Sequence, residues 1–325
     1  MARSVAIVGA GQIGYQANFA FVDRGWSSKI HARSKPNWKR YGSKVIRHDI
    51  ASDPAPRADC VVDTIAFDAG DVERYDPERV GRLILISSAS VYSDAHGRTL
   101  DEARENGFPI FDGPISEAQQ TVAPGPETYS TRKIRMEQRA VELFGERVTI
   151  LRPCAIYGKW SRHPREWWFV KRLLDRRTVI PLLRPAHSRF QPTDAEDIGI
   201  FAVDAAEHEL SGIFNIADDD CPDVTEIGDT IASYMDREVR FVALAEEAEI
   251  GRTPWSIPRP FIISSQKAAN ATGHIFSRYY PGALHAVEWL SKHRPSDWRA
   301  AFPQLAAYPW DLFDYAAEDR VLASL

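Results

Sequence analysis

A tyrosine and a lysine four positions apart, Tyr129 and Lys133, are residues of this sequence that could carry out chemistry together. They stand in the stretch ETYSTRKIRMEQRA, residues 127–140, which is predicted to be helical. Residues at i and i+4 lie one above the other on a helix. The phenol could exchange a proton with a substrate oxygen, and a neighbouring ammonium would favour its ionised form. Taken alone, the pair is more typical of an ordinary solvated helix, because Y-x-x-x-K arises by chance in many chains.

A glycine-rich turn near the start of the chain suggests a partner for that pair. It follows an apolar run predicted to be a strand, and it opens a predicted helix. Gly9 permits a tight turn, Gly11 lets a pyrophosphate approach the backbone, and Gly14 lets the helix lie close to the strand. A strand, this turn and a helix in succession predict a dinucleotide site built from Gly9, Gly11, Gln12, Ile13 and Gly14.

The residues after the second predicted strand bear on which dinucleotide would bind. An acidic residue at this place would accept hydrogen bonds from the ribose 2′-hydroxyl of NAD. The sequence has Arg33, Ser34 and Lys35 instead, whose cationic and hydroxyl groups suit a 2′-phosphate. We therefore expect NADP, with NAD as the alternative if these are ordinary surface charges. After the third predicted strand, Asp49 and Ile50 offer a carboxylate and an apolar side chain to the adenine.

Short apolar runs alternate with helical stretches through the first half of the chain. Nearly continuous apolar strands separated by helices are typical of a parallel sheet covered on both faces. The sequence therefore predicts an α/β fold, a Rossmann-type doubly wound parallel sheet with a smaller C-terminal substrate-binding region. The predicted strands are residues 4–8, 29–32, 44–47, 60–65, 82–86 and 148–151.

The pattern loosens after residue 158, where tryptophan and proline become frequent. A chain of 325 residues suits one large domain or two smaller ones. We expect a dinucleotide-binding Rossmann domain over residues 1–158 and a substrate-binding region over residues 159–325. The latter is expected to be interleaved with the last sheet elements, at residues 190–217. The long polar segment 94–126 is expected to form a lid or substrate loop.

The bulk composition narrows the class of partner. A net charge of -5 gives no electrostatic reason to expect nucleic acid or an anionic membrane. The three cysteines have neither zinc-ligand nor disulfide spacing, so we expect no metal. No apolar run is long enough to cross a bilayer, and we see no signal peptide before the first strand. We expect a cytoplasmic protein that acts on a small molecule.

Further motifs follow the glycine turn in a fixed order. Together they resemble the extended short-chain dehydrogenase/reductases, the group that includes the NAD-dependent epimerases and dehydratases. The resemblance covers residues 4–235, and the spacing of the glycines is closer to that of the group's atypical members. The motifs that carry it are S-S-A-S-V-Y at 87–92, Y-x-x-x-K at 129–133, L-R-P-C-A-I-Y-G at 151–158, D-I-G at 197–199 and G-I-F-N-I-A at 212–217.

The resemblance implies a Ser-Tyr-Lys triad. Tyr129 would be the general acid or base, and Lys133 would favour its phenolate and hold the nicotinamide ribose. Ser88 would hydrogen-bond the reacting oxygen, and Ser90 would contact the substrate. The same resemblance places four residues beside the cofactor, namely Ile65, Ala66, Pro153 and Ala155.

Two departures from the group's patterns limit the expected chemistry. Ala89 and Ser90 occupy the place where the dehydratases carry an Asp-Glu pair, so water elimination lacks its acid and base. Ala155 stands where some sugar-nucleotide enzymes hold the substrate with an asparagine, which weakens the case for a nucleotide-sugar substrate.

We therefore expect an NADPH-dependent carbonyl reductase or alcohol dehydrogenase, with a hydride passing between the nicotinamide and a substrate carbon. The alternative is an NAD-dependent sugar or nucleotide-sugar epimerase. An alternative of another class is a non-enzymatic relative that senses a dinucleotide or binds RNA. Trp167 and Arg189 are the expected substrate contacts in the C-terminal region. Because members of the group often dimerise, a homodimer is a further option.

Overall fold

The computed structural model describes residues 2–36, 38, 43–245 and 250–325. The chain divides into two compact units, each assembled from three separate segments. The first unit contains residues 1–154, 195–217 and 263–276, and the second contains residues 155–194, 218–262 and 277–325.

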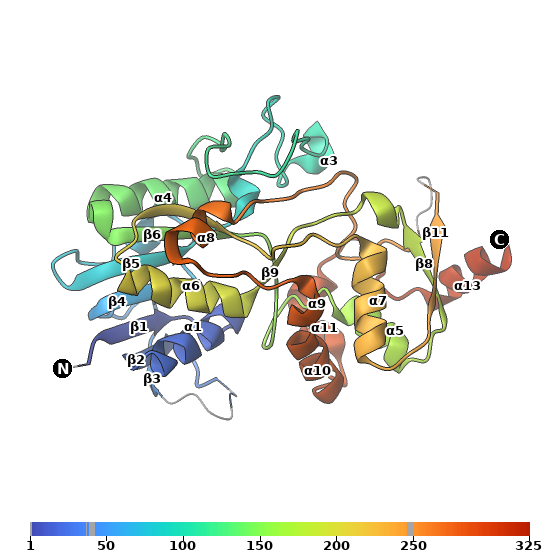
Figure 1. Ribbon diagram of the computed structural model, residues 1–325, viewed down its shortest axis with the longest axis horizontal. Coiled ribbons are helices and arrows are strands. Elements are labelled where there is room, and N and C mark those ends of the chain that lie inside the picture. The colour runs from blue at the N-terminus through green and yellow to red at the C-terminus, as the bar shows by residue number, and fades with distance from the viewer. Residues whose placement is uncertain (1, 37, 39–42, 246–249) are drawn as a thin grey trace. The chain divides into compact units, whose positions relative to one another are not determined.

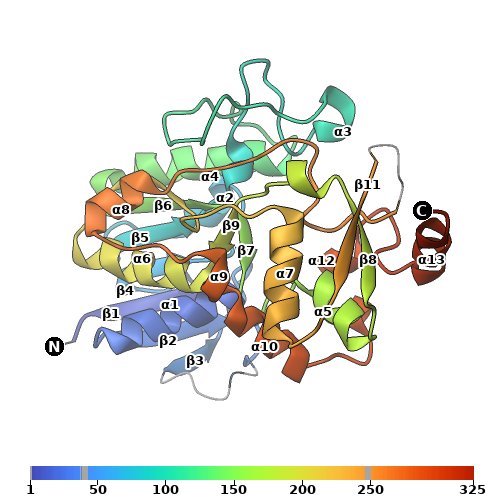
Figure 2. The same cartoon turned by 45° about the vertical axis from the view of Figure 1, so that its right-hand side comes forward.

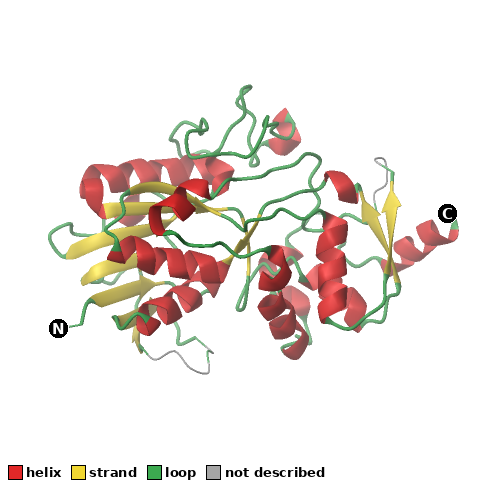
Figure 3. Cartoon of the chain, viewed as in Figure 1, coloured by secondary structure: helices red, strands yellow, loops and turns green. Residues whose placement is uncertain are grey.

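A seven-stranded sheet forms the centre of the first unit (Figures 1 and 3). All its strand pairs are parallel, and the strand order is β10-β6-β5-β4-β1-β2-β3. Reading outward from β1, the chain runs first to one edge and then to the other, which is the doubly wound arrangement. The predicted fold class is therefore confirmed. The strands are β1 Ser4–Val8, β2 Ser27–Ala32, β3 Lys44–Arg47, β4 Ala58–Asp63, β5 Val80–Ile86, β6 Val148–Pro153 and β10 Gly212–Ile216.

Helices cover both faces of this sheet (Figures 1 and 2). One face carries Ala6 and Val8, whose side chains join Met136 and Phe144 of helix α4 in one apolar cluster. The opposite face carries Ile7, which lies beside helix α1 at Gly14, and helix α6 packs against α1. The helices of this unit are α1 Gln12–Asp23, α2 Ala69–Val72, α3 Ala103–Asn106, α4 Tyr129–Phe144, α6 Ala195–Glu207 and α8 Gln266–Thr272, with the 3₁₀ turns η1 Ala89–Val91 and η2 Gly145–Arg147.

The fourth strand ends earlier than the sequence predicts. A strand over residues 60–65 was expected, whereas β4 ends at Asp63 and leaves Ile65 49% exposed. The physical reason is the Asp63 carboxylate, which accepts hydrogen bonds from the backbone N–H groups of Ile65 and Ala66, each at 2.8 Å. These bonds replace the strand ladder with a turn.

The second unit has two small parallel pairs of strands, β7 with β9 and β8 with β11. Aromatic side chains fill its core, among them the fully buried Trp168 and Trp255. Its strands are β7 Ala155–Tyr157, β8 Val179–Leu183, β9 Pro192–Asp194 and β11 Arg240–Leu244. Its helices are α5 Trp167–Leu174, α7 Val224–Tyr234, α9 Tyr279–Gly282, α10 Leu284–Lys292, α11 Trp298–Ala301, α12 Pro303–Ala306 and α13 Tyr315–Ala323, with the 3₁₀ turn η3 Pro185–His187.

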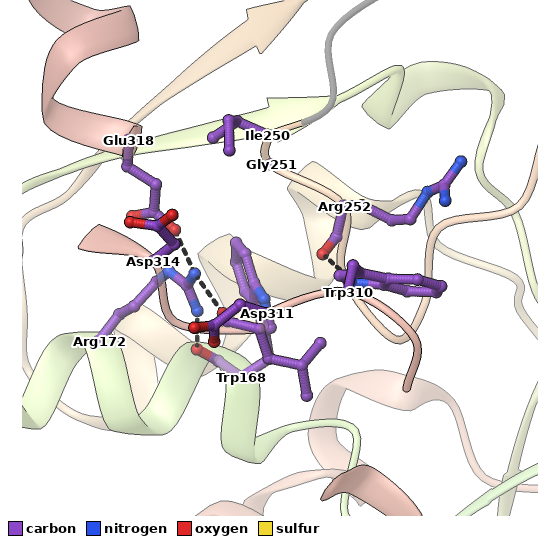
Figure 4. A pocket seen from close by; sticks show the side chains of 10 residues that line it. Trp168, Arg172, Ile250, Gly251, Arg252, Trp310, Asp311, Asp314 and Glu318 are labelled. Atoms are coloured by element: carbon purple, nitrogen blue, oxygen red, sulfur yellow. Dashed lines mark hydrogen bonds and ion pairs between the residues drawn. The ribbon is translucent and has the colours of Figure 1, made fainter. Parts of the chain in front are cut away.

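A buried ion pair fastens the last helix, α13, to helix α5 (Figure 4). Arg172 of α5 is 1% exposed and donates to the Glu318 carboxylate of α13. The same guanidinium donates to the carbonyl oxygen of Leu312 at 2.7 Å and to that of Trp168 at 3.0 Å. A small hollow lies around these groups, and the polar groups that line it form bonds that hold helix α13 in place. Among the described residues, no helix is long and apolar enough to cross a membrane.

A second buried charge in this unit should make its stability depend on pH. Glu166, just before α5, is 1% exposed, and burial raises the pKa of its carboxyl to about 7 from 4.5. The folded chain therefore keeps a proton that the unfolded chain releases, and the free energy of unfolding falls as pH rises between these two values. Glu166→Gln removes this loss, so the variant should be about 3 kcal/mol more stable than the parent at about pH 8.

Chemical denaturation of both proteins across the pH range measures this difference. The gain should shrink toward zero as pH falls below 4.5, where the parent carboxyl becomes neutral in both states. A gain of equal size at every pH would mean that Glu166 does not titrate in this range.

Candidate active site

The predicted site residues of the first unit gather at one edge of the sheet. The glycine turn follows β1, Ala66 follows β4, Ser88 follows β5, and Pro153 is the last residue of β6. Because all these strands are parallel, their carboxyl ends meet at the same edge, where ligands bind in open α/β sheets. This edge is the candidate active site.

The glycine turn forms a cradle that side chains would fill. Gly9 has a φ of +104°, and a Cβ there would lie 2.2 Å from Oγ1 of Thr64. A Cβ on Gly14 would lie 2.1 Å from the carbonyl oxygen of Gly9. At Gly11, by contrast, a Cβ would meet nothing within 4 Å, so this backbone faces open space. The turn is thus tight where helix and strand meet and open where a pyrophosphate would lie.

Polar groups at the start of α1 also fit a bound anion. No side chain caps this helix, whose N-cap residue is Gly11. Gln12 follows, and its Oε1 atom, a buried acceptor without a hydrogen-bond partner among the described residues, suits a hydroxyl of a bound ligand rather than a phosphate. Helix N-termini and the N–H groups of such turns bind phosphate. The residues present therefore fit a nicotinamide dinucleotide.

Tyr129 is the first residue of α4, which the Thr128 side chain caps. Its ring contacts Phe67, with the two centroids 5.4 Å apart. Although 43% of the residue is exposed, burial of its phenol raises the pKa of Tyr129 to about 12, and the neighbouring Ser88 hydroxyl only partly opposes this. The phenol therefore holds its proton at neutral pH.

Lys133 lies one helical turn further on and is 6% exposed. Its Nζ atom donates to the carbonyl oxygens of Ala66, at 2.7 Å, and Ile86, at 2.9 Å. It stands 5.7 Å from the centroid of the Tyr129 ring. Burial lowers the pKa of the ammonium to about 8, and the carboxylate of Asp63 opposes the shift. An ammonium has three donors, so two of them are satisfied by the ends of β4 and β5.

Three serine hydroxyls form a chain beside the tyrosine. Ser88 donates to the Ser90 hydroxyl at 2.9 Å, and Ser130 donates to the same oxygen at 2.9 Å. Ser88 also accepts from the Ser90 backbone N–H at 3.1 Å, which fixes the turn after β5. Ser130 is also 2.9 Å from the Ser90 carbonyl oxygen, so its single proton has two acceptors and the three hydroxyls form one hydrogen-bonded cluster. Ser130 was not predicted from the sequence, although it adjoins Tyr129.

Asp63 is a further residue that the sequence analysis missed. It is fully buried, and burial raises the pKa of its carboxyl. Besides the two N–H groups of the turn, it accepts from the hydroxyl of Tyr75 at 2.6 Å. It thereby shapes the turn whose Ala66 carbonyl receives Lys133. In the sequence, the only sign of this role is that Asp63 is an acidic residue inside the apolar run of residues 60–65.

A buried ion pair supports the site from the next turn of α4. Glu137 of α4 and Arg152 of β6 are each 3% exposed, and the Nε atom of Arg152 donates to Glu137 at 3.0 Å. Ser87, next to Ser88, also donates to this carboxylate. Burial lowers the pKa of Arg152, but its bonds to Glu137 outweigh this and hold the pKa above its usual range. The pair joins α4 to the ends of β5 and β6.

The predicted adenosine-side residues flank a basic hollow at the ends of β2 and β3. Arg33, Ser34 and Lys35 line it together with three residues that the sequence analysis did not select, namely Ser43, Val45 and Arg47. None of the described residues that line it is acidic. We call this surface the basic hollow.

Other predicted cofactor residues occupy turns and strand ends. Asp49 is exposed and accepts from the N–H of Ala51 at 3.0 Å, so it shapes the turn after β3, next to the half-buried Ile50. Pro153 ends β6, whereas Ala155 begins β7 and belongs to the second unit. Their roles toward a cofactor remain predictions.

The two predicted substrate residues of the second unit are engaged within that unit. Trp167 is 1% exposed and packs edge-on against Phe302, with centroids 5.5 Å apart, and its role toward a substrate stays a prediction. Arg189 donates to the carbonyl oxygen of Cys221 at 2.7 Å. Its guanidinium also lies 3.9 Å from Asp223, and 39% of its side chain is exposed.

No group of three or more histidine, cysteine or acidic residues that could hold a metal ion occurs within the described part of the chain.

Comparison with known proteins gives no match to a protein-family model. No curated protein sequence matches either. Similarity is found only among solved structures.

Three of these structures show the kind of protein that this chain is similar to. A UDP-N-acetylglucosamine 4-epimerase from Bacillus cereus is 17% identical, with a TM-score of 0.64 over 90% of this chain and 100% of that one. A UDP-glucuronic acid 4-epimerase from Bacillus cereus, in complex with UDP-glucuronic acid and NAD, is 15% identical, with a TM-score of 0.65 over 89% and 99%. A dTDP-glucose 4,6-dehydratase from Bacillus anthracis, in complex with NAD, is 14% identical, with a TM-score of 0.64 over 94% and 100%. The chain thus has the fold of the nucleotide-sugar epimerases and dehydratases, the group that its motifs resemble.

Proposed function

We propose that this chain is an NAD(P)-dependent enzyme that transfers a hydride at a carbon bearing a hydroxyl or carbonyl oxygen. The observation that carries the proposal is the arrangement of Tyr129, Ser88 and Lys133. The Ser88 hydroxyl is near enough to the Tyr129 phenol to affect its pKa, and the Lys133 ammonium lies 5.7 Å from the centroid of the tyrosine ring. All three stand at the sheet edge that also carries the glycine cradle.

In this proposal the dinucleotide, when bound, supplies the hydride donor or acceptor. Tyr129 donates a proton to the substrate oxygen during reduction, for which its raised pKa keeps it protonated, and accepts that proton during oxidation. Ser88 orients the same oxygen by a hydrogen bond. Ser90, in the same hydroxyl cluster, contacts a second polar group of the substrate. Lys133 keeps its third N–H for a ribose hydroxyl and favours the phenolate by its charge.

Sugar epimerisation is the form of this chemistry that the comparisons favour over carbonyl reduction. The solved structures named above are nucleotide-sugar epimerases and a dehydratase, and two of them hold NAD. In an epimerase, one carbon is oxidised and then reduced again at the other face, so the same tyrosine acts first as base and then as acid. Dehydration is disfavoured, because Ala89 and Ser90 stand where an Asp-Glu pair would be needed.

NADPH-dependent carbonyl reduction is the second candidate, and the basic hollow favours it. Arg33 and Lys35 would pair with the 2′-phosphate that distinguishes NADP from NAD, with Ser34 as a further donor. The 2′-phosphate is remote from the nicotinamide, so NADP would also be compatible with epimerisation. A dinucleotide sensor is disfavoured, because sensing has no need of a tyrosine held between a serine and a lysine.

The dinucleotide released on denaturation separates the two candidates. Freshly purified protein is unfolded, and the supernatant is analysed for NAD, NADH, NADP and NADPH. Near-stoichiometric release is expected, because an epimerase must keep its cofactor through both half-reactions. For an epimerase, the dinucleotide should also stay bound during purification and should not exchange with dinucleotide added to the buffer.

Two other results would point elsewhere. A protein that is empty when purified but binds NADPH reversibly would favour the reductase and justify a screen of carbonyl compounds. A protein that neither releases nor binds any of the four dinucleotides would contradict the proposed function as a whole.

A further inference from the structure

The basic hollow is built from two strands, although the sequence motif for dinucleotide choice lies on only one of them. Arg33 and Lys35 follow β2, whereas Arg47 is the last residue of β3. The segment after β2 and the strand β3 both contribute lining residues, and none of the described ones is acidic. The hollow is thus a local concentration of cations on a chain whose net charge is -5.

The strand register places Arg47 beside Arg33. The parallel pairing sets Ala32 opposite Arg47, and the N–H of His48 donates to the carbonyl oxygen of Ala32 at 2.9 Å. Arg33 is the next residue after Ala32, and neighbouring strands lie about 4.8 Å apart. The two guanidinium groups therefore start from adjacent backbone positions and line the same hollow.

The hollow also lies next to the glycine cradle. Gly9 donates its N–H to the carbonyl oxygen of His31 at 2.9 Å, so the cradle and the end of β2 are hydrogen-bonded to one another. In dinucleotide folds, the ribose of the adenosine follows the pyrophosphate toward the end of the second strand. A phosphate on that ribose would face Arg33 and Arg47 together.

The polar neighbours of Arg47 have separable roles. Ser43 donates its hydroxyl to Oδ1 of Asn18 in α1 at 2.6 Å, so its proton is used to position the start of β3. Ser34 has no such bond among the described residues and can donate to a ligand. A phosphate monoester carries between one and two negative charges at neutral pH, which suits two guanidinium groups and an ammonium.

We propose that Arg47 is a specificity-determining residue for the cofactor, forming with Arg33 a two-strand clamp for the 2′-phosphate of NADP. This inference rests on the proposed function only in that it requires dinucleotide binding. It holds for a reductase and for an epimerase alike. It adds to the predicted Arg33, Ser34 and Lys35 a residue that no motif selects.

Binding of two small nucleotides tests the clamp without any substrate. Calorimetric titration with 2′,5′-ADP and with 5′-AMP compares a ligand that has the 2′-phosphate with one that lacks only that group. The parent should prefer 2′,5′-ADP, and Arg47→Gln should weaken 2′,5′-ADP binding about tenfold with 5′-AMP binding unchanged. Arg47→Lys should recover only part of the loss, because lysine cannot bond a phosphate bidentately.

Lys44→Gln is the matched control. Lys44 lies on the same strand and is exposed, but strand alternation points it to the opposite face, and it does not line the hollow. It should leave the binding of both nucleotides unchanged, and thermal melting of each variant checks that it is folded. If Lys44→Gln and Arg47→Gln lose the same 2′,5′-ADP affinity, the effect would come from the lower positive charge of the surface and not from a specific contact.

Three outcomes overturn the inference. Equal binding of both nucleotides by the parent would mean that no 2′-phosphate site exists. If Arg33→Gln loses 2′,5′-ADP binding but Arg47→Gln does not, the phosphate would be bound only by residues that follow β2. If the parent binds neither nucleotide, and no dinucleotide either, the proposed function fails together with the clamp.

Discussion

The Tyr129→Phe variant is expected to lose about a thousandfold in turnover while it keeps its affinity for the dinucleotide. Phenylalanine retains the ring that contacts Phe67 and removes only the hydroxyl, whose neighbour is the Ser88 hydroxyl. Proton transfer to the substrate oxygen then has no donor at the right place. The measurement is kcat in whichever sugar or carbonyl assay the parent supports, together with a binding titration of the dinucleotide.

Tyr280→Phe is a suitable control for loss of a phenol as such. Tyr280 belongs to the second unit, is 58% exposed and stacks on Tyr234. Its removal should change neither turnover nor dinucleotide binding. Retained turnover in Tyr129→Phe would exclude the proposed acid-base role. A parallel loss of dinucleotide affinity would instead indicate that the phenol mainly holds the cofactor.

The Glu137→Ala variant is expected to lose about 3–5 kcal/mol in the free energy of unfolding. Glu137 is the carboxylate partner of Arg152, and both side chains are 3% exposed. Removing it leaves a buried guanidinium unpaired, which is costly because water cannot replace the lost partner. The Ser87 hydroxyl loses its acceptor at the same time. Chemical denaturation monitored by tryptophan fluorescence measures the loss.

Helix α4 offers a matched control for this experiment. Glu142 lies on the same helix and also pairs with an arginine, Arg139, at 2.9 Å, but its side chain is 63% exposed. Glu142→Ala should change the stability little, because water solvates the freed arginine. Similar losses in the two variants would contradict the account based on burial. Replacing Glu137 and Arg152 together by apolar residues should cost less than Glu137→Ala alone.

The fold could be predicted from the sequence because local patterns determine it. Apolar runs marked the strands of the first unit, and G-x-G-x-x-G after the first run identified the turn where the dinucleotide would lie. Parallel strands place the ends of those runs at one edge, so Ser88, Tyr129 and Ala66 could be expected near each other. Their catalytic and binding roles remain predictions.

The missing parts of the site depend on register and on three-dimensional packing, which no local pattern encodes. Arg47 lines the basic hollow because β3 pairs with β2 in one particular register. Lys133 reaches two backbone carbonyls, although the sequence suggested that it chiefly serves the tyrosine. Trp167 is buried in the core of its own unit, which no local pattern indicated. In each case the decisive contact joins residues far apart in the chain.

The segmented composition of the first unit has a consequence for how this protein is made. Its sheet includes β10 and its α1 face is covered by α6, while the last segment of the unit ends only at residue 276. During synthesis on the ribosome, the strands up to residue 154 emerge before the helix that covers one of their faces and before an edge strand. A nascent sheet in that state exposes apolar surface and unpaired strand edges. This apolar face and this strand edge stay uncovered until α6 and β10 have been synthesised, the latter ending at residue 216.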